Sequence, residues 1–369
     1  MTQAPKRILI IRLSAIGDVL RVLPALQVLK RHFPNSYIGW VVEEGAYDLL
    51  AAQPSIDEVF LFPKKSLLSK FASIRTFGEG MREFASFIRS IRTNRFDLVI
   101  DFHGLFKSGL ISLLSGAPDR VGFARGDCKE GNFLFTNRRF SLGKPRISRI
   151  ERNLALLKKM GLDTAHERPI IHVPEPDREY VRQFFRQHQI DRRRPVIAIH
   201  PGTSPDTPYK RWEPYRYAVV ADQAIAGSAA QVIFTWAGSE IEMVQEIVGM
   251  MKYRAIIAPE LHNLCQLAAV FGSSDVFLGS DTGPMHLAAF VGIPVVAVFG
   301  PTDHVVNEPY ARTPHIIVRK EMPCSPCRKY RCQKRDCIKD ISEVNVIKAI
   351  DIMIAYMKQK KAAPADPLP

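Results

Sequence analysis

Short apolar runs of strand length alternate with segments of helical spacing along most of the chain. The first runs are Arg7–Leu13, Tyr37–Val42 and Glu58–Phe62, and the segment Val19–Phe33 between them carries its leucines near one helical face. Such alternation of strand and helix is typical of a parallel sheet that is covered by helices on both faces. The first half of the chain is therefore predicted to form a doubly wound α/β domain.

The same alternation starts again in the second half of the chain. Strands are expected at Pro195–His200, Gln231–Trp236, Asp275–Leu278 and Ile293–Phe299, and the proline-bearing stretch His166–Pro176 has the composition of a linker. The sequence thus predicts an α/β protein with two Rossmann-like domains that face a central cleft. The expected divisions are residues 1–170, residues 171–340, a closing helix at 341–358 that packs back toward the N-terminal domain, and a disordered tail at 359–369.

The segment Pro63–Arg95 differs from its surroundings because basic and apolar residues interleave along it. It carries eight Lys and Arg residues and only two acidic ones. An ordinary surface helix with its apolar face on the core is the favoured structural interpretation. Contact of part of this segment with an anionic membrane surface is an additional hypothesis.

Composition excludes several classes of protein. The chain of 369 residues is 46% hydrophobic and 24% charged, which is typical of a soluble globular protein. It shows no export signal and no apolar run of membrane-spanning length, so a cytoplasmic location is expected. Neither half has GxGxxG after its first strand or a GxxxxGK[ST] motif, which argues against a dehydrogenase and a P-loop hydrolase.

The net charge of +14 indicates an anionic partner or a basic solvated surface. Most of the excess, about +10, lies before Pro176. Nucleic acid, an anionic lipid and a phosphorylated or carboxylated substrate would each fit this charge. No recognition-helix motif or interleaved aromatic platform occurs, so nucleic acid is not the expected partner.

The stretch Gly279–Asp303 carries the clearest chemical signal. A strand ends in Ser280-Asp281-Thr282-Gly283, and a helix with Pro284 in its first turn follows. Backbone N–H groups and the helix dipole converge at such a position, which is where open α/β sheets bind phosphates. A helix cap formed by Asp281 or Thr282 is the alternative interpretation.

Other polar residues of the second half follow strands in the same way. Lys210 offers a point charge to a diphosphate, and Glu240 could accept hydrogen bonds from a ribose diol. No DxD pair is present to hold a divalent metal, so the set matches a metal-independent nucleotide-diphosphate site. Its candidate residues are Thr203, Ser204, Lys210, Glu240, Asp281, Thr282, Gly283 and His286.

In the first half, Asp18 follows the Gly17 turn at the start of a helix. The helix dipole stabilises a carboxylate there as an anion. Asp18 is either an N-terminal capping residue or a general base that takes a proton from an acceptor hydroxyl.

Taken together, four stretches resemble glycosyltransferase family 9, the lipopolysaccharide heptosyltransferases. They are SAIGDVL with the following LPAL, DFHGLFKS, HPGTS with KRW, and SDTGPMHLAA with FGPTD. The resemblance runs from Arg7 to about Ile354. It implies the GT-B fold and metal-independent, inverting transfer of L-glycero-D-manno-heptose from ADP-heptose, with Asp18 as the general base and the second-half set at the donor.

Within that family, DFHGLFKS and Phe135-Thr136-Asn137-Arg138 look more like the transferase that adds the first heptose to the Kdo of the inner core, heptosyltransferase I. The family usually has Gln where His103 stands. The resemblance implies an anionic lipid-linked saccharide acceptor and a location at the cytoplasmic face of the inner membrane. Candidate acceptor residues are His103, Lys107, Arg120, Arg125, Arg138 and Arg139.

A cysteine-rich loop at 321–338 departs from the best-known members of the family. Cys324, Cys327, Cys332 and Cys337 lie in one basic stretch. Four thiolates suit tetrahedral Zn²⁺ or Fe, so a structural metal is one hypothesis. Reduced free thiols are the other.

The leading hypothesis is therefore a heptosyltransferase that needs no cofactor for catalysis. A GT-B transferase of another sugar, or one that modifies a protein, remains an alternative, and the cysteine loop keeps it open. A non-catalytic nucleotide-sugar binder or a nucleic-acid binder is less favoured.

Overall fold

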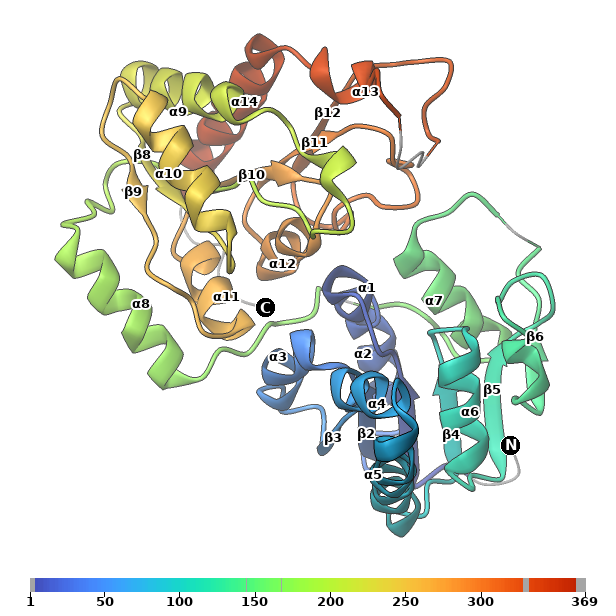
Figure 1. Ribbon diagram of the computed structural model, residues 1–369. Coiled ribbons are helices and arrows are strands. Elements are labelled where there is room, and N and C mark those ends of the chain that lie inside the picture. The colour runs from blue at the N-terminus through green and yellow to red at the C-terminus, as the bar shows by residue number, and fades with distance from the viewer. Residues whose placement is uncertain (1–3, 144, 167, 328–331, 363–369) are drawn as a thin grey trace. The chain divides into compact units, whose positions relative to one another are not determined.

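The computed structural model describes residues 4–143, 145–166, 168–327 and 332–362. The chain divides into two compact units between His172 and Val173 (Figure 1). No helix in the described ranges is long and apolar enough to cross a membrane.

The N-terminal unit contains a six-stranded parallel sheet in the order β3-β2-β1-β4-β5-β6. This order is that of a Rossmann sheet, and β1 and β4 are its central strands. The strands are β1 Arg7–Ile11, β2 Tyr37–Val42, β3 Glu58–Leu61, β4 Leu98–Asp101, β5 Asp119–Phe123 and β6 Arg138–Phe140. The helices are α1 Ile16–Leu20, α2 Leu23–His32, α3 Tyr47–Ala51, α4 Lys64–Phe71, α5 Ile74–Thr93, α6 Phe106–Leu114 and α7 Arg149–Lys159.

Two expected single segments are each divided into a pair of helices. The segment Val19–Phe33 contains the end of α1 and all of α2, because Pro24 has no N–H group and sits in the first turn of a new helix. The basic segment Pro63–Arg95 forms α4 and α5, and Ser73 caps α5 by accepting the N–H of Arg75 at 3.3 Å.

The C-terminal unit repeats the architecture with a second six-stranded parallel sheet, in the order β12-β11-β10-β7-β8-β9. Its strands are β7 Val196–His200, β8 Gln231–Phe234, β9 Ile256–Ile257, β10 Val276–Ser280, β11 Val295–Phe299 and β12 His315–Arg319. Its helices are α8 Glu175–Gln187, α9 Pro214–Ser228, α10 Glu240–Met250, α11 Leu264–Gly272, α12 Gly283–Val291, α13 Asp336–Lys339 and α14 Glu343–Ala362. The predicted α/β class and the two Rossmann-like units are confirmed.

The closing helix α14 belongs to the core of the C-terminal unit. Its buried residues Val346, Ile350 and Ile354 pack in one apolar cluster with residues of α9 and the second sheet. The sequence led us to expect this helix to pack toward the N-terminal domain. The side chains on its apolar face complete the layer of helices over the sheet of the C-terminal unit.

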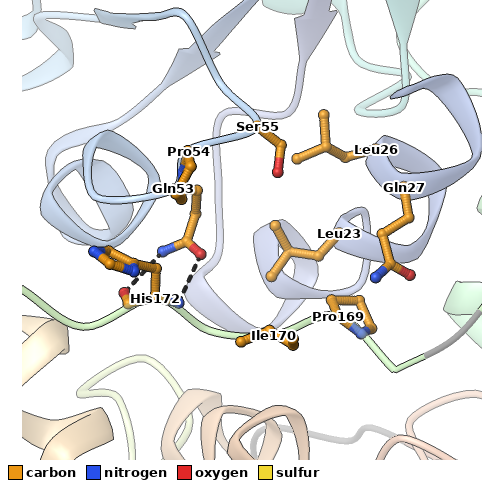
Figure 2. Close-up of a pocket in the computed structure, with 9 residues that line it drawn as sticks. All are labelled: Leu23, Leu26, Gln27, Gln53, Pro54, Ser55, Pro169, Ile170 and His172. Atoms are coloured by element: carbon orange, nitrogen blue, oxygen red, sulfur yellow. Dashed lines mark hydrogen bonds between the residues drawn. The ribbon is translucent and has the colours of Figure 1, made fainter. Parts of the chain in front are cut away.

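The chain that leaves the N-terminal unit is fixed by one buried amide. The side chain of Gln53 accepts the N–H of His172 at 3.0 Å and donates to the carbonyl of the same residue at 3.2 Å (Figure 2). A pocket of about 370 Å³ lies beside this contact, and Figure 2 shows Leu23 and Leu26 of α2 on one wall, with Pro169 and Ile170 below. The first unit thus ends at the residue that this amide bonds.

We expect Ile350→Ala to destabilise the protein by about 2–5 kcal/mol, because it leaves a cavity among fully buried side chains. Ile352→Ala on the same helix is the matched control, since Ile352 is 58% exposed and should cost no more than about 0.5 kcal/mol. Urea unfolding measures both. Equal costs would contradict the assignment of α14 to this core.

Candidate functional site

In the N-terminal unit, three arginine side chains surround Asp18 near the carboxyl end of β1. Arg12 lies directly after β1, and its Nη2 is 2.5 Å from Asp18 Oδ2. Arg21, one turn along from Asp18, places Nη1 at 2.8 Å from Oδ1, and Arg149 of α7 places Nη1 at 3.4 Å from the same oxygen. We call these four residues the Asp18 cluster.

The charges of this cluster control the ionisation of Asp18. Burial by itself would raise the pKa of the carboxyl group, but Arg12, Arg149 and Arg21 outweigh it and hold the pKa well below its ordinary value. Asp18 is therefore an anion at any physiological pH. Its side chain makes no N-terminal capping bond in the structure, because α1 has no side-chain cap.

His103 follows β4 and lies close enough to the Asp18 cluster to sense its charge. Both ring nitrogens are buried and have no hydrogen-bond partner among the described residues. Burial, together with the positive charges of Arg12 and Lys107, lowers the pKa of His103 to about 3. The imidazole is thus neutral and has one free acceptor and one free donor.

A buried carboxylate shapes the loop that carries His103. Asp101 accepts the N–H groups of His103 and Gly104 at 2.8 and 3.0 Å, and it also accepts bonds from Ser108 Oγ at 2.8 Å and Asn132 Nδ2 at 2.7 Å. Burial raises the pKa of Asp101 despite these four bonds. The DFHGLFKS stretch is therefore held in one conformation by its first residue.

Lys107 is an ion-pair partner on the same edge of the sheet. Its Nζ lies 2.5 Å from Glu43 Oε1, and Lys64 Nζ lies 3.2 Å from the other oxygen of that carboxylate. Burial opposes ionisation of Glu43, but the bonds and charges of the two lysines outweigh it and lower the pKa of Glu43. Two lysine cations pair with one carboxylate here, so the net charge of these three side chains is positive.

The four arginines that were proposed for the acceptor lie farther along the sheet. Arg120 is in β5 and bonds the carbonyls of Ala117 and Phe135 at 2.7 and 3.1 Å. Arg138 pairs with Asp119 at 2.6 Å, and Arg139 donates to the carbonyl of Thr136 at 2.8 Å. Arg125 follows β5, with its guanidinium 6.0 Å from the ring centroid of Phe133.

Residues 120, 138 and 139 therefore make their bonds within β5, β6 and the loops beside them, and β5 is the direct neighbour of β4, the strand that His103 follows. Among the four arginines proposed for the acceptor, Arg125 is the one that follows the carboxyl end of a strand, β5.

In the C-terminal unit, the proposed donor residues gather at the ends of adjacent strands. Thr203 follows β7, Glu240 follows β8 and Asp281 follows β10, and these three strands are neighbours. Lys210 Nζ lies 2.8 Å from Asp281 Oδ2, and His286 Nε2 lies 3.9 Å from Oδ1. The ion pair holds the ammonium group at the start of α12, beside the backbone of Thr282 and Gly283.

Glu240 is fitted against the loop after β7. A Cβ atom on Gly202 would lie 2.1 Å from Glu240 Oε1, so a larger residue at this position would displace the carboxyl group of Glu240. Burial raises the pKa of Glu240, and its Oε2 accepts the N–H of Ala237 at 2.9 Å and lies 3.5 Å from Nε2 of His200. Burial also lowers the pKa of His200 to about 4, so this imidazole is neutral.

Two buried hydroxyl groups in this region lack partners. Thr203 Oγ1 and Thr302 Oγ1 have no hydrogen-bond partner among the described residues, and both residues follow strands of the sheet. Unsatisfied buried polar groups are uncommon in folded proteins, and they mark positions where a ligand can bond. Ser204, by contrast, is exposed.

Comparison with known proteins then decides the family. The family model described as glycosyltransferase family 9 (heptosyltransferase) matches residues 84–338, which is more than half of the chain. The chain belongs to glycosyltransferase family 9.

One curated protein and two solved structures illustrate the range of similarity. The lipopolysaccharide core heptosyltransferase OpsX of Haemophilus influenzae is 27% identical over 319 residues, which cover 86% of this chain and 85% of the relative. A family-9 glycosyltransferase structure from Veillonella parvula has 26% identity and a TM-score of 0.80, covering 95% of this chain and 98% of that one. Heptosyltransferase WaaC of E. coli, solved with ADP-2-deoxy-2-fluoro heptose, has 21% identity and a TM-score of 0.71, covering 95% and 99% of the two chains. The fold is thus GT-B, and the protein is a glycosyltransferase of the lipopolysaccharide heptosyltransferase family.

All six cysteines of this family-9 chain are free thiols. Cys337 is buried, and the nearby thiols of Cys327, Cys324 and Cys332 add to burial in raising its pKa, so the four side chains lie in one neighbourhood. Within the described ranges, no three His, Cys, Asp or Glu side chains are arranged so that they could hold a metal ion. Residues 328–331 of the loop lie outside the described ranges.

Sequence reasoning missed the arginines that control Asp18 in this glycosyltransferase. Arg12 is only 7% exposed, and the signal that could have found it is an arginine near the end of the apolar run Arg7–Leu13. Arg21 stands three residues after Asp18, which is the spacing of a helical ion pair. Arg149 had no local signal, because only the folding of α7 brings it to Asp18.

We expect His103→Gln to flatten the pH dependence of stability. The lowered pKa of His103 contributes stability that is present above the ordinary histidine pKa of about 6.5 and is lost as the pH falls toward 3, because only the unfolded chain then binds the proton. When the pH falls from 7 to 5, the free energy of unfolding of the wild type should decrease by up to about 2 kcal/mol more than that of the variant. Urea unfolding at both pH values measures this difference, and parallel profiles would contradict a neutral buried His103.

Proposed function

We propose that this protein transfers L-glycero-D-manno-heptose from ADP-heptose to an inner-core lipopolysaccharide acceptor of the Kdo–lipid A type, at the cytoplasmic face of the inner membrane. The observation that carries the proposal is the pairing of an anionic Asp18, held among three arginines, with a nucleotide-type site at the strand ends of a family-9 fold. The ADP-2-deoxy-2-fluoro heptose bound by the WaaC neighbour and the lipopolysaccharide core role named for the OpsX relative support the same chemistry.

The donor would bind to the C-terminal unit. Lys210 and the N–H groups at the start of α12 would hold the diphosphate, and Glu240 would accept hydrogen bonds from the ribose diol. The unpartnered hydroxyl groups of Thr203 and Thr302 would complete the bonding of the phosphates or the sugar. No catalytic metal is needed in this arrangement, since the lysine and the helix dipole stabilise the charge that develops on the departing ADP.

The acceptor would bind to the N-terminal unit, where cations outnumber anions around Asp18. Arg12, Arg21 and Arg149 make Asp18 a weak base while the site is empty, because they stabilise its ionised form. A carboxylated or phosphorylated acceptor would supply a second anion to these arginines. Their hold on Asp18 would then weaken, and its pKa would rise toward the value that a general base requires.

The reaction is a single inverting displacement. The acceptor hydroxyl oxygen forms a bond to the anomeric carbon of the heptose as the bond from that carbon to the phosphate oxygen of ADP breaks. The hydroxyl proton passes to the carboxylate of Asp18, and ADP leaves with the electron pair. The free ring nitrogens of His103 and the ammonium of Lys107 would position the acceptor.

The test is to incubate the protein with ADP-heptose and Kdo₂-lipid A, or its deacylated form, and to weigh the products. We expect one added heptose, and Asp18→Asn should lower the rate by about 10²–10⁴-fold because no group then accepts the proton. The variant should bind ADP within about twofold of the wild type, since the donor residues belong to the other unit.

Glu44→Gln is the matched control for this change, because Glu44 forms an exposed ion pair with Lys65 in the same unit. It should retain full activity. Undiminished turnover by Asp18→Asn would exclude Asp18 as the base. Transfer of a different sugar, or transfer to a protein and not to the lipid, would support the alternative substrate class.

We propose further that Cys324, Cys327, Cys332 and Cys337 bind a structural Zn²⁺ or Fe ion. Four thiolates suit either metal as ligands. Within the described residues the four thiols are not arranged around a common point, so metal binding would bring them together. Metal analysis of the purified protein should give about one ion per chain, and Cys324→Ser with Cys337→Ser should lose it. Cys128→Ser is the control and should keep the metal. Six titratable thiols with no bound metal would contradict the proposal.

A further inference from the structure

The hairpin formed by α4 and α5 ends in a group of apolar side chains exposed to solvent. Ile74 is 97% exposed, Leu68 is 62% exposed, and Phe77 and Met81 are about half exposed. Phe71 joins them, since its ring centroid lies 5.3 Å from that of Phe77. Single exposed apolar residues are normal, but a cluster of five marks an interaction surface. We call Leu68, Phe71, Ile74, Phe77 and Met81 the hairpin tip.

The apolar face of α5 is longer than the core that it covers. Phe87 and Ile88 are buried in the core of the N-terminal unit, and Phe84 packs at its margin. Ile74, Phe77 and Met81 continue the same helical spacing toward the start of α5, where no core residue covers them. About two turns of this face are therefore available for another surface.

The tip is held in a fixed arrangement. Glu83 of α5 accepts bonds from Lys70 Nζ at 2.9 Å and Ser66 Oγ at 2.8 Å, both on α4. The backbone at Gly80 touches the Phe71 ring, since a Cβ atom there would lie 2.6 Å from it. These contacts hold α4 and α5 side by side (Figure 1) and present the apolar side chains at little further entropic cost.

Positive charge surrounds the tip. The segment 63–95 carries eight basic and two acidic residues, and Glu83 is already paired with Lys70. Arg75 and Arg82 flank the apolar residues, are exposed, and form no ion pair with a described residue. An apolar centre with a basic rim is complementary to an anionic phospholipid surface, in which acyl chains lie beneath phosphate headgroups. A second copy of the chain would instead place like charges opposite each other.

We propose that the hairpin tip inserts into an anionic phospholipid surface and that Arg75 and Arg82 bind its headgroups. The inference rests on the proposed function in one respect: a lipid-linked acceptor gives the protein a reason to contact a membrane. The contact itself is a separate property of α4 and α5.

Co-sedimentation with vesicles tests this docking. Vesicles of phosphatidylcholine with about 30% phosphatidylglycerol should bind the full-length protein, and pure phosphatidylcholine vesicles should bind it at least tenfold more weakly. Ile74→Ser with Phe77→Ser should weaken binding at least tenfold. Arg75→Gln with Arg82→Gln should weaken it by roughly fivefold per charge at low salt, and by less at high salt.

Matched controls lie on α14 of the other unit. Ile352→Ser removes an exposed apolar side chain, and Lys358→Gln with Lys360→Gln removes two exposed charges. Both should bind vesicles as the wild type does, and thermal unfolding should confirm that every variant is folded. Unchanged binding by the hairpin variants, or equal losses in the controls, would overturn the proposal. A different result would also overturn it: light scattering shows that the wild type is a dimer, and the hairpin variants are monomers whose binding to vesicles is unchanged.

The acceptor assay separates this inference from the proposed function. Hairpin variants should lose turnover on Kdo₂-lipid A embedded in vesicles and keep it on the deacylated acceptor in solution. Vesicle binding without heptose transfer by the wild type would refute the proposed function alone. Equal losses of turnover on both acceptors would refute a membrane role for the tip.

Discussion

The parallel direction of the strands is the constraint on which both candidate sites depend. Each sheet pairs all of its strands in parallel, so the residues that follow the strands collect along one edge. Thr203, Glu240 and Asp281 come from distant parts of the sequence and meet because β7, β8 and β10 are neighbours. Arg12 and His103 are brought together in the same way by β1 and β4.

Electrostatics gives the two units different characters. In the N-terminal unit one carboxylate, Asp18, faces three arginines, and two lysines share Glu43, so anionic ligands are favoured. In the C-terminal unit Lys210 is matched by Asp281, and His200 is neutral through burial. The candidate donor site there offers mainly backbone donors and closely packed side chains, such as Glu240 against Gly202.

Sequence patterns pointed to Asp18 and the donor residues because they lie in the turns and helix starts that come after strands, and these positions can be predicted from local spacing. They did not identify Arg149 or the role of Asp101. Asp101 binds Asn132, which lies 31 positions away, and Arg149 reaches Asp18 across 131 positions. Charge alone suggested Arg120, Arg138 and Arg139 for an acceptor site, and the folded chain shows that they also bond locally beside β5 and β6.

The sequence by itself determined the alternation of strands and helices, the two-unit α/β class, the strand-end polar residues and the excess of positive charge, because all of these are local or compositional properties. Tertiary structure decided which charges meet, where α14 packs and how far the apolar face of α5 extends beyond its core. These outcomes depend on burial and on contacts between distant segments. A periodic pattern shows that a helix has an apolar face, but only the folded chain shows how much of that face is covered.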